Sequence, residues 1–341
     1  VNSNTNPFID NKSAVEFLIN KSRGFATTLF PIASLKKMNT TEFKQLAQQT
    51  DFIYLPPFTH ESVSKLKKLT KKPLIFDPLI SKYLTKVFDY QQVSRYSPRA
   101  YKNYLKDKIP LHKSSLIIAD TEEHKHYYSS KFNINPNKIK VLPIGAETTQ
   151  FKPTERVENT LFNVGFYGGF IPLQGVTHII EAANILANQP DIHFNLIGTE
   201  FEWEKMKQLA KKYKLNNITF MGWCNYNELA DKINEFDICL GIFGNTPKTD
   251  LVIPNKIYHY AALKKCIITK KTNAITELFT HQENIILTEN TPQSIAKHIL
   301  SLKNNAAFTQ KIATGGYELI TKNYNEHQIA SQFISILENS F

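Results

Sequence analysis

Short apolar runs alternate with amphipathic stretches along the whole chain of 341 residues. The apolar runs are rich in β-branched and aromatic residues, a composition that predicts buried strands. Eleven such runs span residues 24–30, 51–55, 74–77, 115–119, 139–144, 162–167, 192–197, 217–221, 237–242, 265–269 and 284–288. Helical spacing of apolar residues appears between them, at 13–20, 41–48, 62–69 and most clearly at 175–188. Alternation of hydrophobic strands with helices predicts parallel sheets covered on both faces.

The alternation is interrupted by a polar stretch at residues 147–160 and then begins again. The sequence therefore predicts an α/β fold with two doubly wound, Rossmann-like domains facing across a cleft. We expect residues 1–147 to form the first domain and 148–325 the second, with a helix at 326–341 that packs back on the first. Doubly wound domains bind ligands at the carboxyl ends of their strands, so the loops after strands are the places to look for function.

The longest apolar stretch, residues 24–35, is short and broken by Thr and Pro. A membrane span needs about 18 or more apolar residues, so no transmembrane helix is expected. The three cysteines are widely spaced and form neither a disulfide framework nor a zinc motif, which favours a reducing cytoplasm. The chain begins with Val, and we expect the opening strand of the first domain to lie before it.

The formal net charge of +11 belongs entirely to the first part of the chain. Residues 1–150 hold 23 Lys and Arg against 12 Asp and Glu, whereas residues 151–341 hold 18 of each. Two segments, 62–72 and 95–113, concentrate the charge beside apolar or aromatic residues, and such helices can lie on anionic membranes. A solvated lysine-rich surface is the simpler alternative. Nucleic acid is disfavoured because no recognition motif accompanies the charge.

Residues 167–175, YGGFIPLQG, connect a strong strand to the best helix. Gly168 and Gly169 allow close backbone approach, and the helix start near Gly175 offers N–H groups to an anion such as a phosphate. A tight turn without a ligand is the alternative. The spacing fits neither the dinucleotide-binding fingerprint nor a P-loop.

A second loop, residues 241–259, follows another buried strand and enters a helix near Pro254. Lys248 and Lys256 are its cations, and Asn255 and His259 lie four residues apart on one helical face. This combination suits a ligand that has both hydroxyl groups and a phosphate.

Seven segments together resemble the glycosyltransferases of the family-4 type (glycosyl transferases group 1), which have the GT-B fold. From the second domain these are YGGFIPLQG, GWC at 222–224, GIFGNTPK at 241–248 and VIPNKIYHYAALKKCIIT at 252–269. From the first they are PLIFDPLIS at 73–81, LIIADTEEH at 116–124 and IKVLPIGAETTQF at 139–151. The resemblance covers roughly residues 50–341.

The resemblance implies transfer of a sugar from a nucleotide-sugar donor to a glycan or lipid-linked acceptor, with retention and without a metal or a separate cofactor. The donor would bind the second domain and the acceptor the first. The expected setting is bacterial surface polysaccharide or glycolipid synthesis in the cytoplasm, with the basic first domain peripheral at the inner face of the membrane. The alternative is a catalytically impaired sugar- or nucleotide-binding protein on the same fold.

Three departures from the family pattern bear on the site. Relatives carry Arg and Lys where this chain has Gly169 and Gln174, so Lys248 is expected to meet the phosphates with help from the helix end at Gly175. The family's Glu pair falls on Leu251 and His259; the imidazole could bind a ribose hydroxyl, and Asp250 or the backbone of residues 244–245 would replace the first Glu. The usual His of the first domain is matched by Asp77.

The resulting site prediction has three parts, and it includes no metal ligand. Asp77 and Lys248 are the expected catalytic residues. The donor-binding set is Gly168, Gly169, Gln174, Gly175, Gly222, Trp223, Lys248, Asn255, Lys256, His259 and Glu277. The acceptor-side set is Asp77, Asp120, Thr121 and His124, with an N-cap as the alternative role of Asp120 or Thr121. Trp223 would border the nucleobase or, alternatively, the edge of the core.

Overall fold

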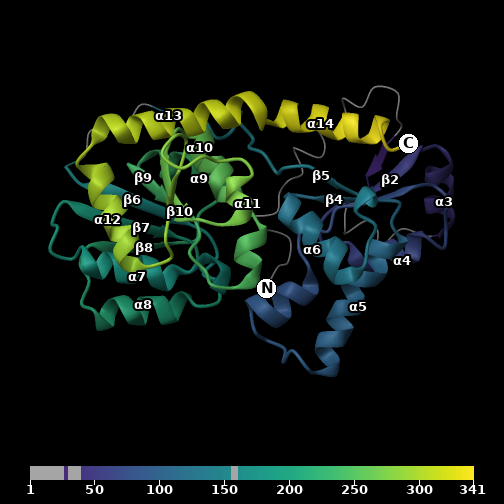
Figure 1. The fold of residues 1–341 in the computed structure, drawn as a ribbon, viewed down its shortest axis with the longest axis horizontal. Helices are drawn as coiled ribbons and strands as arrows, with labels where there is room; N and C mark the ends of the chain where they lie inside the picture. Colours follow the sequence, from purple (N-terminus) through teal and green to yellow (C-terminus); the bar gives the residue numbers. More distant parts are fainter. Residues whose placement is uncertain (1–26, 30–39, 155–159) are drawn as a thin grey trace. The chain divides into compact units, whose positions relative to one another are not determined.

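The computed structural model describes residues 27–29, 40–154 and 160–341 (Figure 1). The predicted helix at 13–20 and the residues before the first strand lie outside these ranges. The described chain divides into two compact units. We call the described residues up to Pro143, together with Ile329–Phe341, the amino unit, and the described residues of Ile144–Gln328 the carboxy unit. In these ranges, every helix is too short or too polar to cross a bilayer.

Five parallel strands form the sheet of the amino unit in the order β1-β2-β3-β4-β5. They span Thr27–Leu29, Phe52–Leu55, Leu74–Phe76, Leu116–Ala119 and Ile139–Val141. The α-helices are α3 (Thr40–Gln48), α4 (His60–Leu66), α5 (Pro98–Lys113) and α6 (Glu122–Phe132). A π-helix, η2 (Leu84–Asp89), and a short 3-10 turn, η3 (Pro136–Lys138), complete the unit. Parallel pairing brings the carboxyl ends of all five strands to one edge.

Both faces of this sheet are buried, because successive side chains of a strand point to opposite faces. Ile53 and Leu55 of β2 belong to a core formed with the helices between the strands. Phe52 and Tyr54 point to the other face, which is covered by the carboxy-terminal helix α14 (Glu326–Glu338). Ala330, Phe333 and Leu337, spaced by three and four residues, supply the apolar stripe of α14.

Six parallel strands form the sheet of the carboxy unit in the order β11-β10-β9-β6-β7-β8. They are β6 (Phe162–Tyr167), β7 (Ile192–Ile197), β8 (Ile218–Gly222), β9 (Ile238–Leu240), β10 (Cys266–Lys270) and β11 (Ile286–Thr288). Short 3-10 turns, η4 (Pro172–Gln174) and η5 (Pro247–Leu251), lie in the loops after β6 and β9.

Helices cover both faces of this second sheet (Figure 1). One face packs against α7 (Val176–Ile185), α8 (Trp203–Lys212) and α12 (Pro292–Lys303). The other packs against α9 (Tyr226–Asn234), α10 (Asn255–Ala262) and the one-turn helix α11 (Asn273–Thr276), and α13 (Ala306–Asn323) contributes to both cores. The parallel α/β fold predicted from the alternation is confirmed, and each strand of the structure lies at a predicted apolar run.

Candidate functional site

The strand order of the carboxy unit creates a switch point beside β6. The chain runs outward from β6 to β7 and β8 and then returns to β9 on the other side of β6. The crevice beyond the carboxyl ends of strands at such a point is the usual ligand site of open α/β sheets. The loops after β6 and β9 are joined there, since Phe243 N–H donates to the Gln174 carbonyl (3.0 Å) and Gly244 N–H donates to that of Leu173 (3.1 Å).

Glycine is required in this crevice for two different reasons. Gly175 has φ +64°, and a Cβ there would lie 2.3 Å from the backbone carbon of Phe243. Gly168 has φ +153°, and a Cβ there would lie 2.8 Å from the Lys256 ammonium nitrogen. The first glycine lets the two loops pack together, and the second leaves room for a lysine from α10. Gly175 also precedes α7 directly, as predicted.

Lys256 is the central cation of the crevice, although it is only 3% exposed. Its ammonium group donates to the side-chain oxygen of Gln174 and lies 3.7 Å from the ring centroid of Phe166. In the described part of the chain, no carboxylate forms an ion pair with it. Burial lowers the pKa of Lys256 well below its usual value. A buried lysine with one neutral acceptor is poised to bind an anion.

His259 is also buried, and its ring is packed between aromatic side chains. It stacks on Phe151 with 3.8 Å between centroids, and its Nδ1 lies 2.6 Å from the hydroxyl oxygen of Tyr167. Burial lowers the pKa of His259 to about 3, so the imidazole is neutral. A neutral ring whose Nδ1 accepts from Tyr167 carries its proton on Nε2, which leaves one N–H donor.

An apolar hollow lies beyond β7 and β8, at the same edge of the sheet. Gly222 ends β8 with φ +77°, and Trp223 follows it with 48% of its surface exposed. Its exposure places Trp223 outside the core, so an aromatic ligand can reach it. The hollow is lined by Tyr167, Ile197, Gly198, Trp223, Cys224, Tyr226 and Leu229.

Four other predicted donor-side residues occupy the surrounding loops. Lys248 is buried within η5, Asn255 is the first residue of α10, and Gly169 lies in the loop after β6. Glu277 directly follows the one-turn helix α11, which Thr272 caps by accepting from Ile275 N–H.

Two carboxyl groups meet a tyrosine and a histidine at the carboxyl edge of the amino unit. Asp77 follows β3; it accepts from the Tyr54 hydroxyl (2.8 Å) and from Leu79 N–H (3.1 Å). Burial raises the pKa of Asp77 to about 7, opposed by the Tyr54 hydrogen bond and reinforced by the charge of Asp120. Asp120 follows β4 and pairs with Nδ1 of His124.

The remaining groups of this cluster show how it is held in place. His124 is fully buried, its ring stacks on Tyr128 at 5.1 Å, and among the described residues its Nε2 has no hydrogen-bond partner. The Thr121 side chain accepts from His124 N–H (3.0 Å) and caps α6. The N-cap interpretation of Thr121 is therefore confirmed. The sequence analysis did not include Tyr54 in the site. The signal that could have identified it is a hydroxyl-bearing residue on the buried strand next to β3.

Solved structures share this architecture. HepE of Anabaena in complex with UDP aligns with a TM-score of 0.69 and 16% identity, over 88% of this chain and 82% of that one. Sucrose-phosphate synthase of Thermosynechococcus elongatus aligns with a TM-score of 0.69 and 15% identity, over 94% and 82%. At these identities the likeness establishes the fold. The chain has the GT-B fold of two Rossmann-like domains.

The sequence comparisons name the family. Residues 162–305, from β6 to beyond α12, match the model of the family Glycosyl transferases group 1. An uncharacterized glycosyltransferase of Methanocaldococcus jannaschii is 21% identical over 241 residues, which are 68% of this chain and 60% of that protein. The chain thus spans about 60% of the length of that curated relative. The family predicted from the motifs is confirmed.

Proposed function

We propose that this protein transfers a sugar from a nucleoside diphosphate sugar, held by the carboxy unit, to a hydroxyl group of a glycan or lipid-linked acceptor. The proposal includes retention of anomeric configuration, and it requires neither a metal nor a separate cofactor. Its setting would be the synthesis of a surface polysaccharide or glycolipid at the inner face of the cytoplasmic membrane. Support for the donor class comes from the family match and from the related HepE structures, which contain UDP and UDP-glucose.

The observation that carries this proposal is the buried ammonium group of Lys256 at the switch point. The family pattern places a lysine at position 174, and this chain has Gln174 there. Lys256 reaches the side chain of Gln174 from α10, so the crevice keeps its cation although the residue that supplies it differs. A diphosphate in the crevice would give the ammonium the anionic partner that it lacks, and would also meet the N–H groups before α7.

Lys256 and Asp77 would each have a role in the reaction. The bond between the anomeric carbon and the diphosphate oxygen breaks, and its electron pair stays on the diphosphate, where Lys256 stabilises the charge. An acceptor hydroxyl oxygen forms the new bond to that carbon. Asp77, as a carboxylate, would accept the proton that this hydroxyl loses and stabilise positive charge developing on the sugar.

A thermal-shift panel of nucleoside diphosphates and their sugars tests the donor class, because a ligand that binds only the folded state raises the unfolding temperature. Release of nucleoside diphosphate is then measured with the best ligand. Binding with turnover supports the transferase. Binding without slow hydrolysis or transfer favours the impaired binding protein, and a panel without any shift contradicts a donor site.

Lys248 provides a separate prediction. Replacing it with alanine is expected to weaken nucleoside diphosphate binding by at least ~1.5 kcal/mol, the scale of a hydrogen bond to a charged group. Titration calorimetry on the variant and the unmodified protein measures this directly. An unchanged affinity would show that the diphosphate does not depend on Lys248.

The sequence predicts two membrane contacts in the amino unit, one around α4 and one around α5. The apolar edge predicted for 62–72 is wrong as a membrane contact, since Val63 and Leu66 are buried in the core and only lysines face outward. The aromatic surface at the start of α5 is different. Tyr96, in the turn before the helix, is 88% exposed, and Tyr101 of α5 is 63% exposed. The guanidinium of Arg95, in the same turn, lies 5.6 Å from the Tyr96 ring centroid.

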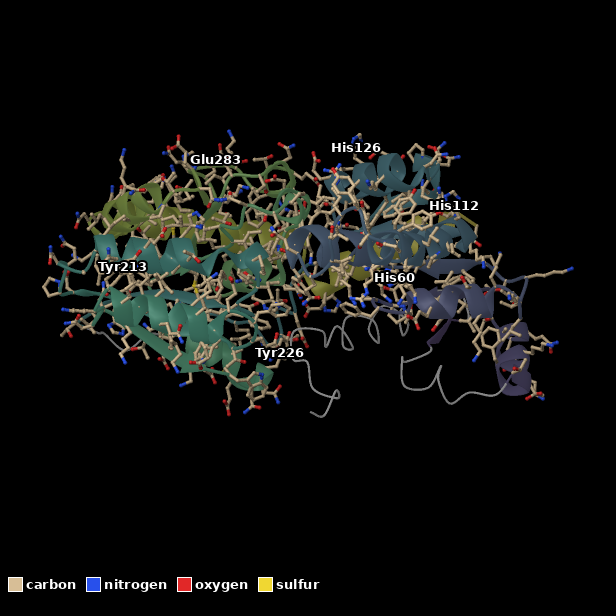
Figure 2. All side chains as sticks on the ribbon, turned by 90° about the horizontal axis from the view of Figure 1, so that it is seen from below. His60, His112, His126, Tyr213, Tyr226 and Glu283 are labelled. Carbon is tan, nitrogen blue, oxygen red and sulfur yellow. The ribbon has the colours of Figure 1, made fainter. Side chains whose placement is uncertain are left out.

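This surface is carried on a firmly held helix. Asp107 of α5 accepts from the Ser81 hydroxyl (2.7 Å) and from the N–H groups of Lys82 (2.9 Å) and Tyr83 (2.8 Å). His60, labelled in Figure 2, lies 3.4 Å from the same carboxylate and is 1% exposed. Aromatic side chains beside exposed Arg and Lys are suited to the interface of an anionic bilayer.

Removing two of these charges, Arg95→Gln with Arg99→Gln, is expected to weaken binding to anionic phospholipid vesicles by roughly 30-fold, at about 1 kcal/mol per charge. Vesicle sedimentation at several salt concentrations measures it. The matched control is Lys211→Gln with Lys212→Gln, exposed residues at the end of α8 in the neutral carboxy unit. Equal losses of vesicle binding in the two double variants, or vesicle binding that does not depend on salt, would contradict a specific membrane-binding surface.

A further inference from the structure

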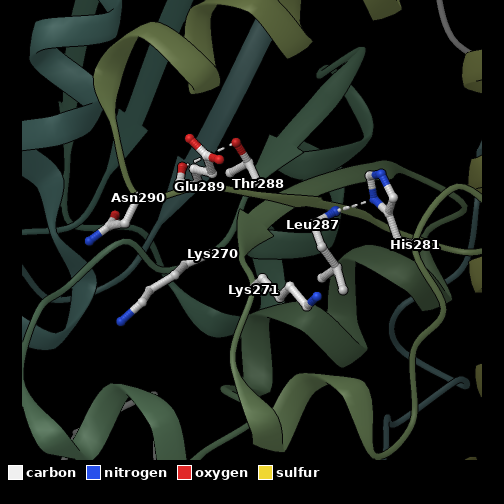
Figure 3. Close-up of a pocket in the computed structure, with 7 residues that line it drawn as sticks. All are labelled: Lys270, Lys271, His281, Leu287, Thr288, Glu289 and Asn290. Carbon is white, nitrogen blue, oxygen red and sulfur yellow. Dashed lines mark hydrogen bonds between the residues drawn. The ribbon is translucent and has the colours of Figure 1, made fainter.

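A second hollow, of about 520 Å³, lies at the carboxyl ends of β10 and β11 (Figure 3). Its volume is within the range of small-molecule sites. Figure 3 shows Lys270 and Lys271 at the end of β10, with Thr288, Glu289 and Asn290 at the end of β11 and His281 to one side. None of these six residues belongs to the donor-binding set described above.

The side chains offer both hydrogen-bond donors and acceptors. Lys271 is exposed, and its ammonium group forms neither a hydrogen bond nor an ion pair within the described ranges. Nδ1 of His281 accepts from Leu287 N–H (3.0 Å), so the neutral ring carries its proton on Nε2. The Asn290 Oδ1 atom is buried and has no hydrogen-bond partner in the part of the chain that the structure describes, and the exposed Glu289 carboxylate is a further acceptor.

This hollow is distinct from the switch-point crevice but connected to it. β11 lies three strands from β6, which is about 14 Å at the usual spacing of ~4.8 Å. Lys270 forms an ion pair with Asp250 (3.2 Å) and donates to the Gly244 carbonyl (3.3 Å). The Asn290 amide donates to the Asn245 side-chain oxygen (2.6 Å). Lys270 and Asn290, which line the hollow, therefore both contact the loop that follows β9.

We infer that this hollow binds an anionic monosaccharide, a hexose carrying a phosphate or a carboxylate, separately from the nucleotide. Lys271 and Nε2–H of His281 would bind the anionic group. Glu289 and Asn290 Oδ1 would accept from ring hydroxyls, which gives the buried amide oxygen the donor it lacks. A neutral sugar would leave Lys271 unpaired, and a simple inorganic anion would leave Asn290 unpaired, so the two features together select this class of ligand.

Titration calorimetry with glucose 6-phosphate, glucuronate and glucose tests the inference. We expect at least one anionic probe to bind with a Kd below about 1 mM and glucose to bind at least tenfold more weakly. Lys271→Gln is expected to weaken binding of the anionic probe about tenfold. The difference in affinity between that probe and glucose should therefore become smaller. Glu289→Gln should weaken the binding of all three probes, because it removes a carboxylate contact to the sugar hydroxyls.

Two controls separate this inference from the proposed function. Lys322→Gln, an exposed residue near the end of α13, should leave probe binding unchanged. Lys256→Met should weaken nucleotide binding and leave the affinity for the probe unchanged. Absence of binding by both anionic probes, an unchanged affinity in Lys271→Gln, or displacement of the probe by UDP would overturn the inference; displacement would show that the hollow belongs to the nucleotide crevice.

Discussion

Replacement of Lys256 by methionine is expected to weaken nucleoside diphosphate binding by about 30- to 150-fold. Methionine keeps an unbranched chain of similar length and removes only the charge. The loss corresponds to about 2–3 kcal/mol, as for a buried hydrogen bond to a charged group. Titration calorimetry measures it, with Lys211→Met on the exposed side of α8 as the control. Equal affinities in the Lys256 variant and the control would exclude Lys256 from the diphosphate site.

The same substitution should change how stability depends on pH. Burial lowers the pKa of folded Lys256, whereas an unfolded lysine titrates near 10.4. Between these two values the unfolded chain binds one more proton, so this residue makes the free energy of unfolding rise with pH, by up to about 1.4 kcal/mol per unit. Urea unfolding at pH 7 and pH 9 should show the rise in the unmodified protein and a smaller one in the variant. Parallel pH dependence of the two proteins would contradict a lowered pKa of Lys256 in the folded state.

Sequence reasoning predicted the strands well because a buried parallel strand leaves a clear local signal. β6, for example, is predicted at 162–167 and observed as Phe162–Tyr167. Helix α7 was equally predictable, because its apolar residues repeat at helical spacing and Gly175 directly precedes it. The signal weakens where an element is short. The one-turn helix α11 ends before Glu277, and no periodicity can set the boundary of a single turn.

The arrangement of the candidate site was less predictable, because it depends on contacts between distant segments. Lys256 and Gln174 are 82 residues apart in the chain and meet only because the loops after β6 and β9 pack together. The sequence indicated that Lys256 and His259 lie on a helix after a strand. It could not show that both are buried, since the apolar residues around them on α10 do not reveal which side meets the sheet.

The cluster around Asp77 and Asp120 was also only partly predictable from the sequence. Asp77 and Asp120 each follow a strand, and neighbouring parallel strands bring such residues to one edge, so their proximity follows from the topology. Tyr54 lies before the end of β2 and looks like an ordinary core residue in the sequence. Only the register of β2 against β3, which pairs Tyr54 with Ile75, brings its hydroxyl to Asp77.

Asp77→Asn is expected to lower the rate of sugar transfer by roughly 10²- to 10⁴-fold, the usual contribution of a positioned acid–base group. The carboxylate is the active form in our proposal, and burial raises the pKa of Asp77 to about 7. Activity of the unmodified protein should therefore rise as pH increases through 7. The asparagine variant should lose this dependence, and Asp231→Asn, exposed on α9, should keep both rate and profile.

Tyr54→Phe distinguishes a direct role of Asp77 from a structural one. The Tyr54 hydrogen bond stabilises the carboxylate and lowers its pKa, so its removal should move the pH profile to higher pH without abolishing transfer. Stability provides a second readout. Between pH 4 and pH 7 the folded protein holds a proton on Asp77 that the unfolded chain has lost, so this residue makes stability fall as pH rises. Asp77→Asn should therefore be more stable than the unmodified protein above pH 7, by up to about 4 kcal/mol. A variant that is both slower and less stable at that pH would indicate that Asp77 serves the fold rather than the reaction.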